Sequence, residues 1–146
     1  MKETRSLAIW HINDKYYLQA YSVSVDGIRY GYNNPIHVLD KDQQKLLGLE
    51  ILETLKECQH QLPNPSITDR NTEIKLLSTL KVKSFKELMQ KGKTVSVYFK
   101  QNELKIIPDY FNGKYLTSSP DRYMYCSLDP DDITRTVLEA FERCHP

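Results

Sequence analysis

The stretch Thr94–Pro108, TVSVYFKQNELKIIP, constrains the fold more than any other part of the chain. Every second residue over 95–99 is apolar, which is the period of a strand that buries one face. After a short polar connection containing Asn102, which tolerates the positive φ of a tight loop, β-branched residues resume over 104–107. Pro108 cannot donate to a sheet ladder, so it should end the second strand or mark an edge. The stretch predicts a β-hairpin at the centre of an antiparallel sheet.

Apolar and aromatic runs in the first forty residues predict more strands. The runs cover 6–12, 15–25, 28–32 and 36–39. Asn13-Asp14 and Asp26-Gly27 lie between successive runs and are turn signals. We interpret this part of the chain as a meander that joins the same sheet.

Two helices with apolar stripes are expected to cover the sheet. The first, 41–59, follows Asp40 as its N-cap and repeats its apolar residues at helical spacing. Gly48 within it costs about 1 kcal/mol relative to alanine, which indicates close packing against the sheet. The last helix, 130–143, has Asp129 as its N-cap and a proline in its first position. Shorter helices are predicted at 72–80 and 85–90, and one more strand at 123–128.

The length and composition fit one soluble globular domain. A chain of 146 residues can bury about two-thirds of its unfolded surface, so we assign 1–146 to a single α+β domain, an antiparallel sheet packed with helices. Hydrophobic residues make up 40% and charged residues 27%, which excludes a disordered chain. The net charge of +1 selects neither nucleic acid nor a membrane surface.

The cysteines and the first residues indicate a cytoplasmic protein. Cys58, Cys126 and Cys144 are odd in number and contain no CxxC pair, so reduced thiols are expected. The N-terminus lacks the apolar core and cleavage site of a signal peptide. No apolar run approaches the roughly 20 residues that cross a bilayer.

Sequence motifs give no catalytic, cofactor or metal site. Glycine-rich phosphate loops and zinc-type His/Cys spacings are absent. The nearest approaches to a metal motif, 58–60 and 144–145, lie at helix ends and are interpreted as ordinary terminal residues. An enzyme would have to assemble its site from distant residues such as His11, His37 and Asp109. We therefore predict a protein that is not an enzyme and needs no cofactor.

Charge is distributed unevenly along the chain. Residues 75–93 contain six lysines and one acid, and residues 121–142 contain six acids and two arginines. The lysines could be a solvated helical face, or they could make a small nucleic-acid-binding domain, which is the alternative function. The acids could stabilise the start of the last helix, or they could face a basic partner.

The order of these features resembles the immunity proteins of bacterial contact-dependent growth inhibition systems. The resemblance is carried by a Tyr-rich N-terminal sheet, the helix at 41–59, the segments 84–88, 93–97 and 106–108, and a closing helix containing Val137–Phe141. It implies a small cytoplasmic protein without catalytic activity. Such a protein binds the C-terminal toxin domain of a large secreted effector and neutralises it. These toxins are often nucleases acting on RNA.

The toxin contacts of that family vary with the toxin, so the resemblance assigns no functional residue here. From the residues themselves we predict a partner-binding surface where a Tyr-bearing strand meets the last helix. Nuclease toxins tend to be basic near the active site, and carboxylates beside aromatic rings suit such a partner. The predicted residues are Asp121, Tyr123, Tyr125, Asp129, Asp131 and Asp132.

Overall fold

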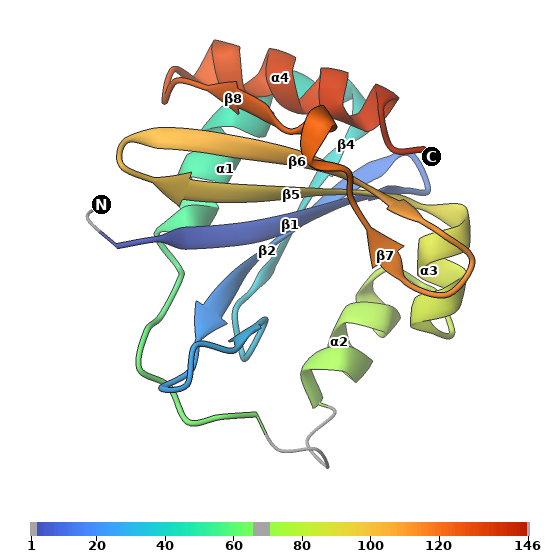
Figure 1. The fold of residues 1–146 in the computed structure, drawn as a ribbon. Helices are drawn as coiled ribbons and strands as arrows, with labels where there is room; N and C mark the ends of the chain where they lie inside the picture. The colour runs from blue at the N-terminus through green and yellow to red at the C-terminus, as the bar shows by residue number, and fades with distance from the viewer. Residues whose placement is uncertain (1–2, 66–70, 146) are drawn as a thin grey trace.

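The computed structural model describes residues 3–65 and 71–145 (Figure 1). Its strands are β1 (Arg5–Ile12), β2 (Lys15–Val23), β3 (Arg29–Tyr30), β4 (Ile36–Asp40), β5 (Lys93–Lys100), β6 (Glu103–Phe111), β7 (Leu116–Thr117) and β8 (Met124–Cys126). Its helices are α1 (Leu47–Leu55), α2 (Asn71–Thr79), α3 (Phe85–Lys91) and α4 (Pro130–Glu142), with 3-10 turns η1 (Lys41–Leu46) and η2 (Pro120–Arg122). The strands form one sheet whose neighbours pair antiparallel, so the predicted α+β class is confirmed.

The central hairpin predicted from the sequence is β5–β6. Gln101 and Asn102 form its turn with φ values of 54° and 60°, the left-handed conformation expected for a tight two-residue loop. Pro108 does not end the second strand, because β6 continues to Phe111, but it does lie where the outer side of β6 has no paired strand among the described residues. Pro108 lies opposite Val95 of β5, between the part of β6 that pairs with β8 and the part that pairs with β7. A residue without an N–H is tolerated at that gap.

The N-terminal strands are present, but their order is only partly a meander. β1 lies in the middle of the sheet and pairs with β2 on one side and β5 on the other. The nine-residue strand β2 is long enough to pair with both β4 and β3, at different positions along its length. The predicted turn at Asn13-Asp14 is confirmed, with φ values of 56° and 58°.

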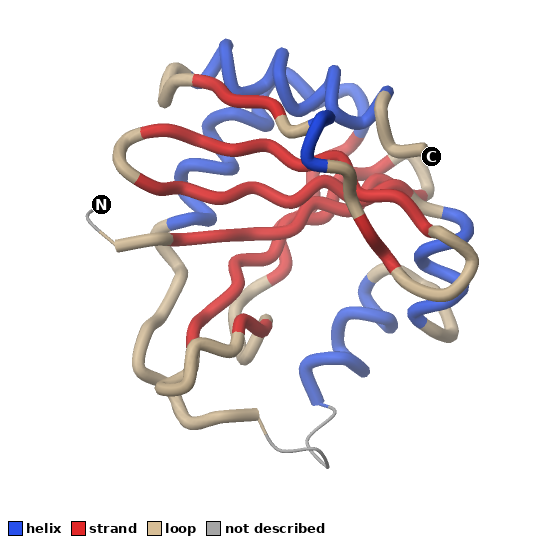
Figure 2. Tube along the Cα trace, viewed as in Figure 1, coloured by secondary structure: helices blue, strands red, loops and turns tan. Residues whose placement is uncertain are grey.

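The helices α1 and α4 pack together on one face of the sheet, as predicted (Figures 1 and 2). Alternate residues of β1, β5 and β6 meet them in the main core, which includes Leu7, Ile9, Val97, Phe99, Leu104, Ile106, Ile51, Leu55, Ile133 and Val137. The predicted bounds 41–59 are wrong, since η1 precedes α1 and α1 ends at Leu55. Gly48 approaches the start of α4 instead of the sheet, within reach of the Pro130 backbone.

The short helices α2 and α3 cover part of the opposite face. A second core forms there from Ala8, Trp10, Ile12, Tyr17, Leu76, Leu80, Val82 and Leu88. These residues of β1 and β2 alternate with those of the main core, so α2 and α3 lie across the sheet from α1 and α4. No helix formed by residues 3–65 or 71–145 is both long enough and apolar enough for a membrane span.

Candidate partner-binding surface

The six predicted partner-binding residues lie around β8 and the start of α4, but the structure divides them between two surroundings. Asp121 lies in the turn η2, and Tyr123 directly follows that turn. Tyr125 is the middle residue of β8. The three remaining aspartates belong to the N-terminus of α4.

Two of the three helix aspartates stabilise the helix itself. Asp129 is the N-cap, and its Oδ2 accepts a hydrogen bond from the Asp132 backbone N–H at 3.1 Å. Asp132 in turn accepts bonds from the backbone N–H and the hydroxyl of Ser127, at 3.0 and 2.9 Å, and pairs with Arg135. The hydrogen bond from the Ser127 backbone is the main cause that lowers the pKa of Asp132. Both carboxylates are therefore engaged in holding the β8–α4 connection.

Asp121 and Asp131 are the carboxylates open to a partner. Both side chains are exposed, and no hydrogen bond or ion pair joins either carboxylate to another residue within 3–65 or 71–145. A carboxylate without an internal partner can contact a cation without first breaking a bond. The acidic half of the predicted surface is thus reduced to these two residues.

Tyr123 and Tyr125 form part of a different group, centred on Lys105. Lys105 lies opposite Tyr125 in the β6–β8 pairing and opposite Tyr98 in the β5–β6 pairing, so the three side chains share one face. Its Nζ is 5.4 Å from the centre of the Tyr98 ring and 5.1 Å from that of Tyr123. Tyr125 is 58% exposed. Sequence reasoning missed Lys105 and Tyr98, although the alternation within 94–108 placed both away from the core.

The three residues suggested for an enzyme site have separate partners. His11 stacks on Tyr16 and contacts the Lys15 carbonyl oxygen through Nδ1 at 3.0 Å. His37 of β4 lies 3.5 Å from Glu50 of α1 through its Nδ1, and 2.8 Å from Oε1 of Glu57, just after α1, through its Nε2. Asp109 accepts a 2.7 Å hydrogen bond from the Ser96 hydroxyl.

These three residues are not linked to one another by a hydrogen bond. Nor do residues 3–65 and 71–145 contain a group of three or more His, Cys, Asp or Glu side chains able to hold a metal ion.

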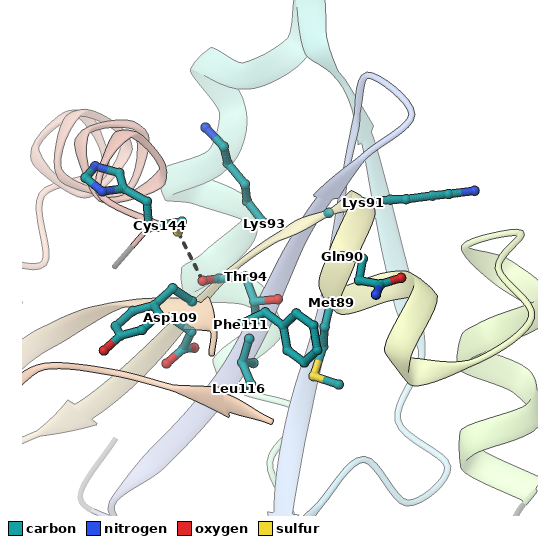
Figure 3. A pocket seen from close by; sticks show the side chains of 12 residues that line it. Met89, Gln90, Lys91, Lys93, Thr94, Asp109, Phe111, Leu116 and Cys144 are labelled. Atoms are coloured by element: carbon teal, nitrogen blue, oxygen red, sulfur yellow. Dashed lines mark hydrogen bonds between the residues drawn. The ribbon is translucent and has the colours of Figure 1, made fainter. Parts of the chain in front are cut away.

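A hollow in the described surface lies beside Asp109, between α3 and the end of α4. Its volume is about 540 Å³, and its lining includes Met89, Lys93, Thr94, Asp109, Phe111 and Cys144 (Figure 3). Asp109 is only 9% exposed, and burial raises its pKa from 3.8 to about 6. Cys144 donates from Sγ to the Thr94 carbonyl oxygen at 3.3 Å. The hollow thus contains a buried carboxylate, that of Asp109, which accepts a hydrogen bond from the Ser96 hydroxyl.

All three cysteines are free thiols whose environment suppresses reactivity. Burial raises the pKa of all three thiols. The pKa of Cys126 is raised to about 11 and the pKa of Cys144 to about 12. Because the thiolate is the reactive form, we expect the native protein to react slowly with a disulfide reagent at about pH 8. Denaturation without reductant should release three thiols. A count of one would contradict this prediction.

The six lysines between 75 and 93 are all exposed; five lie on α2, α3 and the segment that joins them, and Lys93 is the first residue of β5. Lys91 pairs with Glu87 four residues earlier, at 2.9 Å. A solvent-exposed surface is therefore enough to explain why lysines are concentrated between 75 and 93. Because the lysines are exposed, they are also accessible to an anionic partner.

Comparison with known proteins gives matches at the level of structure. No protein-family model and no curated protein matches the sequence. A protein of unknown function from Neisseria meningitidis superposes with a TM-score of 0.74 at 19% identity, over 99% of this chain and 97% of that chain. A chain of the CdiA-CT/CdiI toxin and immunity complex from Yersinia pseudotuberculosis superposes with a TM-score of 0.75 at 14% identity, over 97% of this chain and 98% of that chain. The chain therefore has the fold of a component of a toxin and immunity complex, and the predicted resemblance is confirmed at the level of the fold.

Proposed function

We propose that this chain is an immunity protein that binds the C-terminal toxin domain of a contact-dependent growth inhibition effector and neutralises it. The observation that carries the proposal is the fold match to a chain of a toxin and immunity complex, because it extends over nearly the whole of both chains. An inhibitor of this kind acts in the cytoplasm and needs neither a metal nor a cofactor.

A protein inhibitor needs a rigid scaffold and a surface complementary to its target, and this chain has a candidate for each. The sheet and its two cores supply the scaffold. For a basic nuclease toxin, the free carboxylates of Asp121 and Asp131 would supply the charge, and Tyr123 and Tyr125 the aromatic contact area. Asp129 and Asp132 would contribute indirectly by fixing the start of α4.

Co-expression tests this function directly. An immunity gene should lie directly downstream of a toxin gene, so the proposal predicts a toxin gene immediately upstream of the gene for this chain. The toxin domain that it encodes is the probe. Cells that express the toxin domain should grow only when this chain is also present, and the two purified proteins should form a complex. Continued toxicity together with no complex would refute the proposal.

The acidic contribution is tested by Asp121→Lys combined with Asp131→Lys. Reversing both charges should slow association by about tenfold at low salt and should weaken its salt dependence, because electrostatic complementarity acts mainly on the association rate. Asp132 is left intact because its carboxylate holds Ser127.

The matched control is Asp42→Lys combined with Glu53→Lys, which reverses two exposed charges on η1 and α1. Thermal melting checks that both double variants are folded. An unchanged rate for the first pair and a slower rate for the control would move the acidic contact to α1.

One observation favours the alternative that the chain binds nucleic acid, namely the exposed lysines of 75–93. If the chain binds nucleic acid, neutralising Lys81, Lys83 and Lys86 would abolish that binding. If the chain is an immunity protein, the same change would leave toxin binding unchanged.

A further inference from the structure

Within residues 3–65 and 71–145, no helix covers part of one sheet face. On the side opposite α1 and α4, the helices α2 and α3 pack over the region around Trp10 and Tyr17. The residues of β5, β6 and β8 nearer the β5–β6 turn extend beyond that second core. A sheet normally buries one face and can leave the other in water, so the chemistry of the open part decides whether it has a further use.

The open part carries cations and tyrosine rings in alternation. Tyr98, Lys105 and Tyr125 lie side by side there, in register with the buried Ser6 and with Tyr21, which packs against the second core. From β3, Arg29 donates to the Ser6 hydroxyl at 3.1 Å and places its guanidinium 5.6 Å from the Tyr98 ring centre. We call the group Arg29, Tyr98, Lys105, Tyr123 and Tyr125 the tyrosine–cation face.

Ring contacts hold both cations in place. Arg29 and Lys105 each lie over Tyr98, and Lys105 also lies over Tyr123. Cation–aromatic contact restricts a long side chain, so less freedom is lost when the cation then meets a partner. The face is thus preorganised for binding.

The face also has an excess of positive charge. It borders a hollow of about 320 Å³ lined by Thr4, Tyr98, Lys100, Gln101, Glu103, Lys105 and Tyr125. Lys100 lies opposite Glu103 in the β5–β6 pairing, which offsets one cation with one acid. Within residues 3–65 and 71–145, neither Arg29 nor Lys105 has a carboxylate partner, so both charges remain for an external anion.

We propose that the tyrosine–cation face extends the toxin-binding surface beyond Tyr123 and Tyr125, and that its cations receive an acidic patch of the toxin domain. The proposal rests on the proposed function and names the surface and the chemistry of the partner. Tyrosine and arginine are the residues that supply binding energy at protein interfaces, and an anionic partner matches the two uncompensated cations.

The ring contacts also favour an acidic protein over a nucleic acid. Single-stranded nucleic acids bind platforms on which bases stack against free aromatic faces. Here Arg29 and Lys105 already lie over Tyr98, and Lys105 lies over Tyr123. Carboxylates can approach the cations without displacing them from the rings.

The test measures binding of the upstream-encoded toxin domain to the purified full chain and its variants. Lys105→Glu and Tyr125→Ala should each weaken affinity by about tenfold, the loss typical of a central interface residue. The matched control Lys86→Glu makes the same charge change on the exposed surface of α3 and should bind like the wild type. Because Tyr125 is exposed, its truncation leaves both cores intact, and melting curves verify folding.

The outcomes separate this inference from the proposed function. If the wild type binds the toxin domain and Lys105→Glu binds equally well, the cations of this face receive no acidic patch, whatever the effect of Tyr125→Ala, while the immunity function stands. If the wild type does not bind the toxin domain but binds an oligothymidylate, and Lys105→Glu abolishes that binding, both proposals are overturned and the chain is a nucleic-acid-binding protein.

Discussion

Replacing Gly48 with alanine is expected to lower the free energy of unfolding by about 3 kcal/mol, although alanine is the better helix former. The added Cβ would lie 2.0 Å from the carbonyl oxygen of Pro130 and 2.7 Å from its carbonyl carbon. These are backbone atoms, which cannot rotate away as a flexible side chain could. The clash would force α1 away from α4 and would break the 2.8 Å hydrogen bond from the Gly48 N–H to the Thr134 hydroxyl.

Urea unfolding of the two proteins measures the effect. Leu49→Ala is the control, because Leu49 is the next residue of α1 and its side chain is 54% exposed. It should change stability little. A Gly48→Ala protein as stable as the wild type would mean that α1 and α4 approach less closely than the structure indicates.

The elements that the sequence predicted well have strong local signals. The β5–β6 hairpin is specified by its period-two alternation and by Asn102, which accepts the positive φ of the turn. The N-terminus of α4 is specified by a capping aspartate followed by proline, and the structure places both as predicted. In each case the physical cause acts within about five residues, so a single sequence is enough to reveal it.

What the sequence left undetermined depends on contacts between distant residues. Gly48 signalled close packing, but only the structure identifies α4 as its neighbour. Pro108 is compatible with an inner strand because β8 and β7 pair with β6 on either side of it, an arrangement that no local pattern records.

The predicted binding surface divides for the same reason. Local patterns placed two tyrosines beside four aspartates in the sequence, whereas the pairing of β8 with β6 brings the tyrosines to Lys105. Capping then engages Asp129 and Asp132, which separates them from the free carboxylates. Sequence spacing shows which of these residues are neighbours along the chain, but not which residues they contact in the fold.

Asp109→Asn is expected to stabilise the protein at neutral pH by up to about 3 kcal/mol, because the native fold keeps an ionised carboxylate in a poorly solvated position. Asp109 is 9% exposed, and burial is the main cause that raises its pKa from 3.8 to about 6. The Ser96 hydroxyl opposes the shift by donating to Oδ2 at 2.7 Å. An asparagine oxygen can accept the same bond without carrying the charge.

The sign of the pH dependence follows from the direction of this shift. Between about pH 4 and pH 6 the native carboxyl retains its proton while the unfolded one has lost it, so the native state binds more protons. The Asp109 contribution to stability is therefore complete below about pH 4, is lost as the pH rises to about 6, and is constant above that. Most paired carboxylates have the opposite dependence.

Urea unfolding of the wild type and of Asp109→Asn across this pH range isolates the effect. The difference in unfolding free energy between the two proteins should grow from about pH 4 to about pH 6 and then level off. Asp121→Asn removes the same charge from an exposed position and serves as the control, for which we expect no such growth. Equal pH profiles for Asp109→Asn and the wild type would show that the carboxylate in the hollow is solvated or paired in solution. A stabilised variant would instead show that the ionised Asp109 carboxylate lowers the free energy of unfolding. The toxin-binding assay would then measure whether the hollow beside Asp109 takes part in recognition.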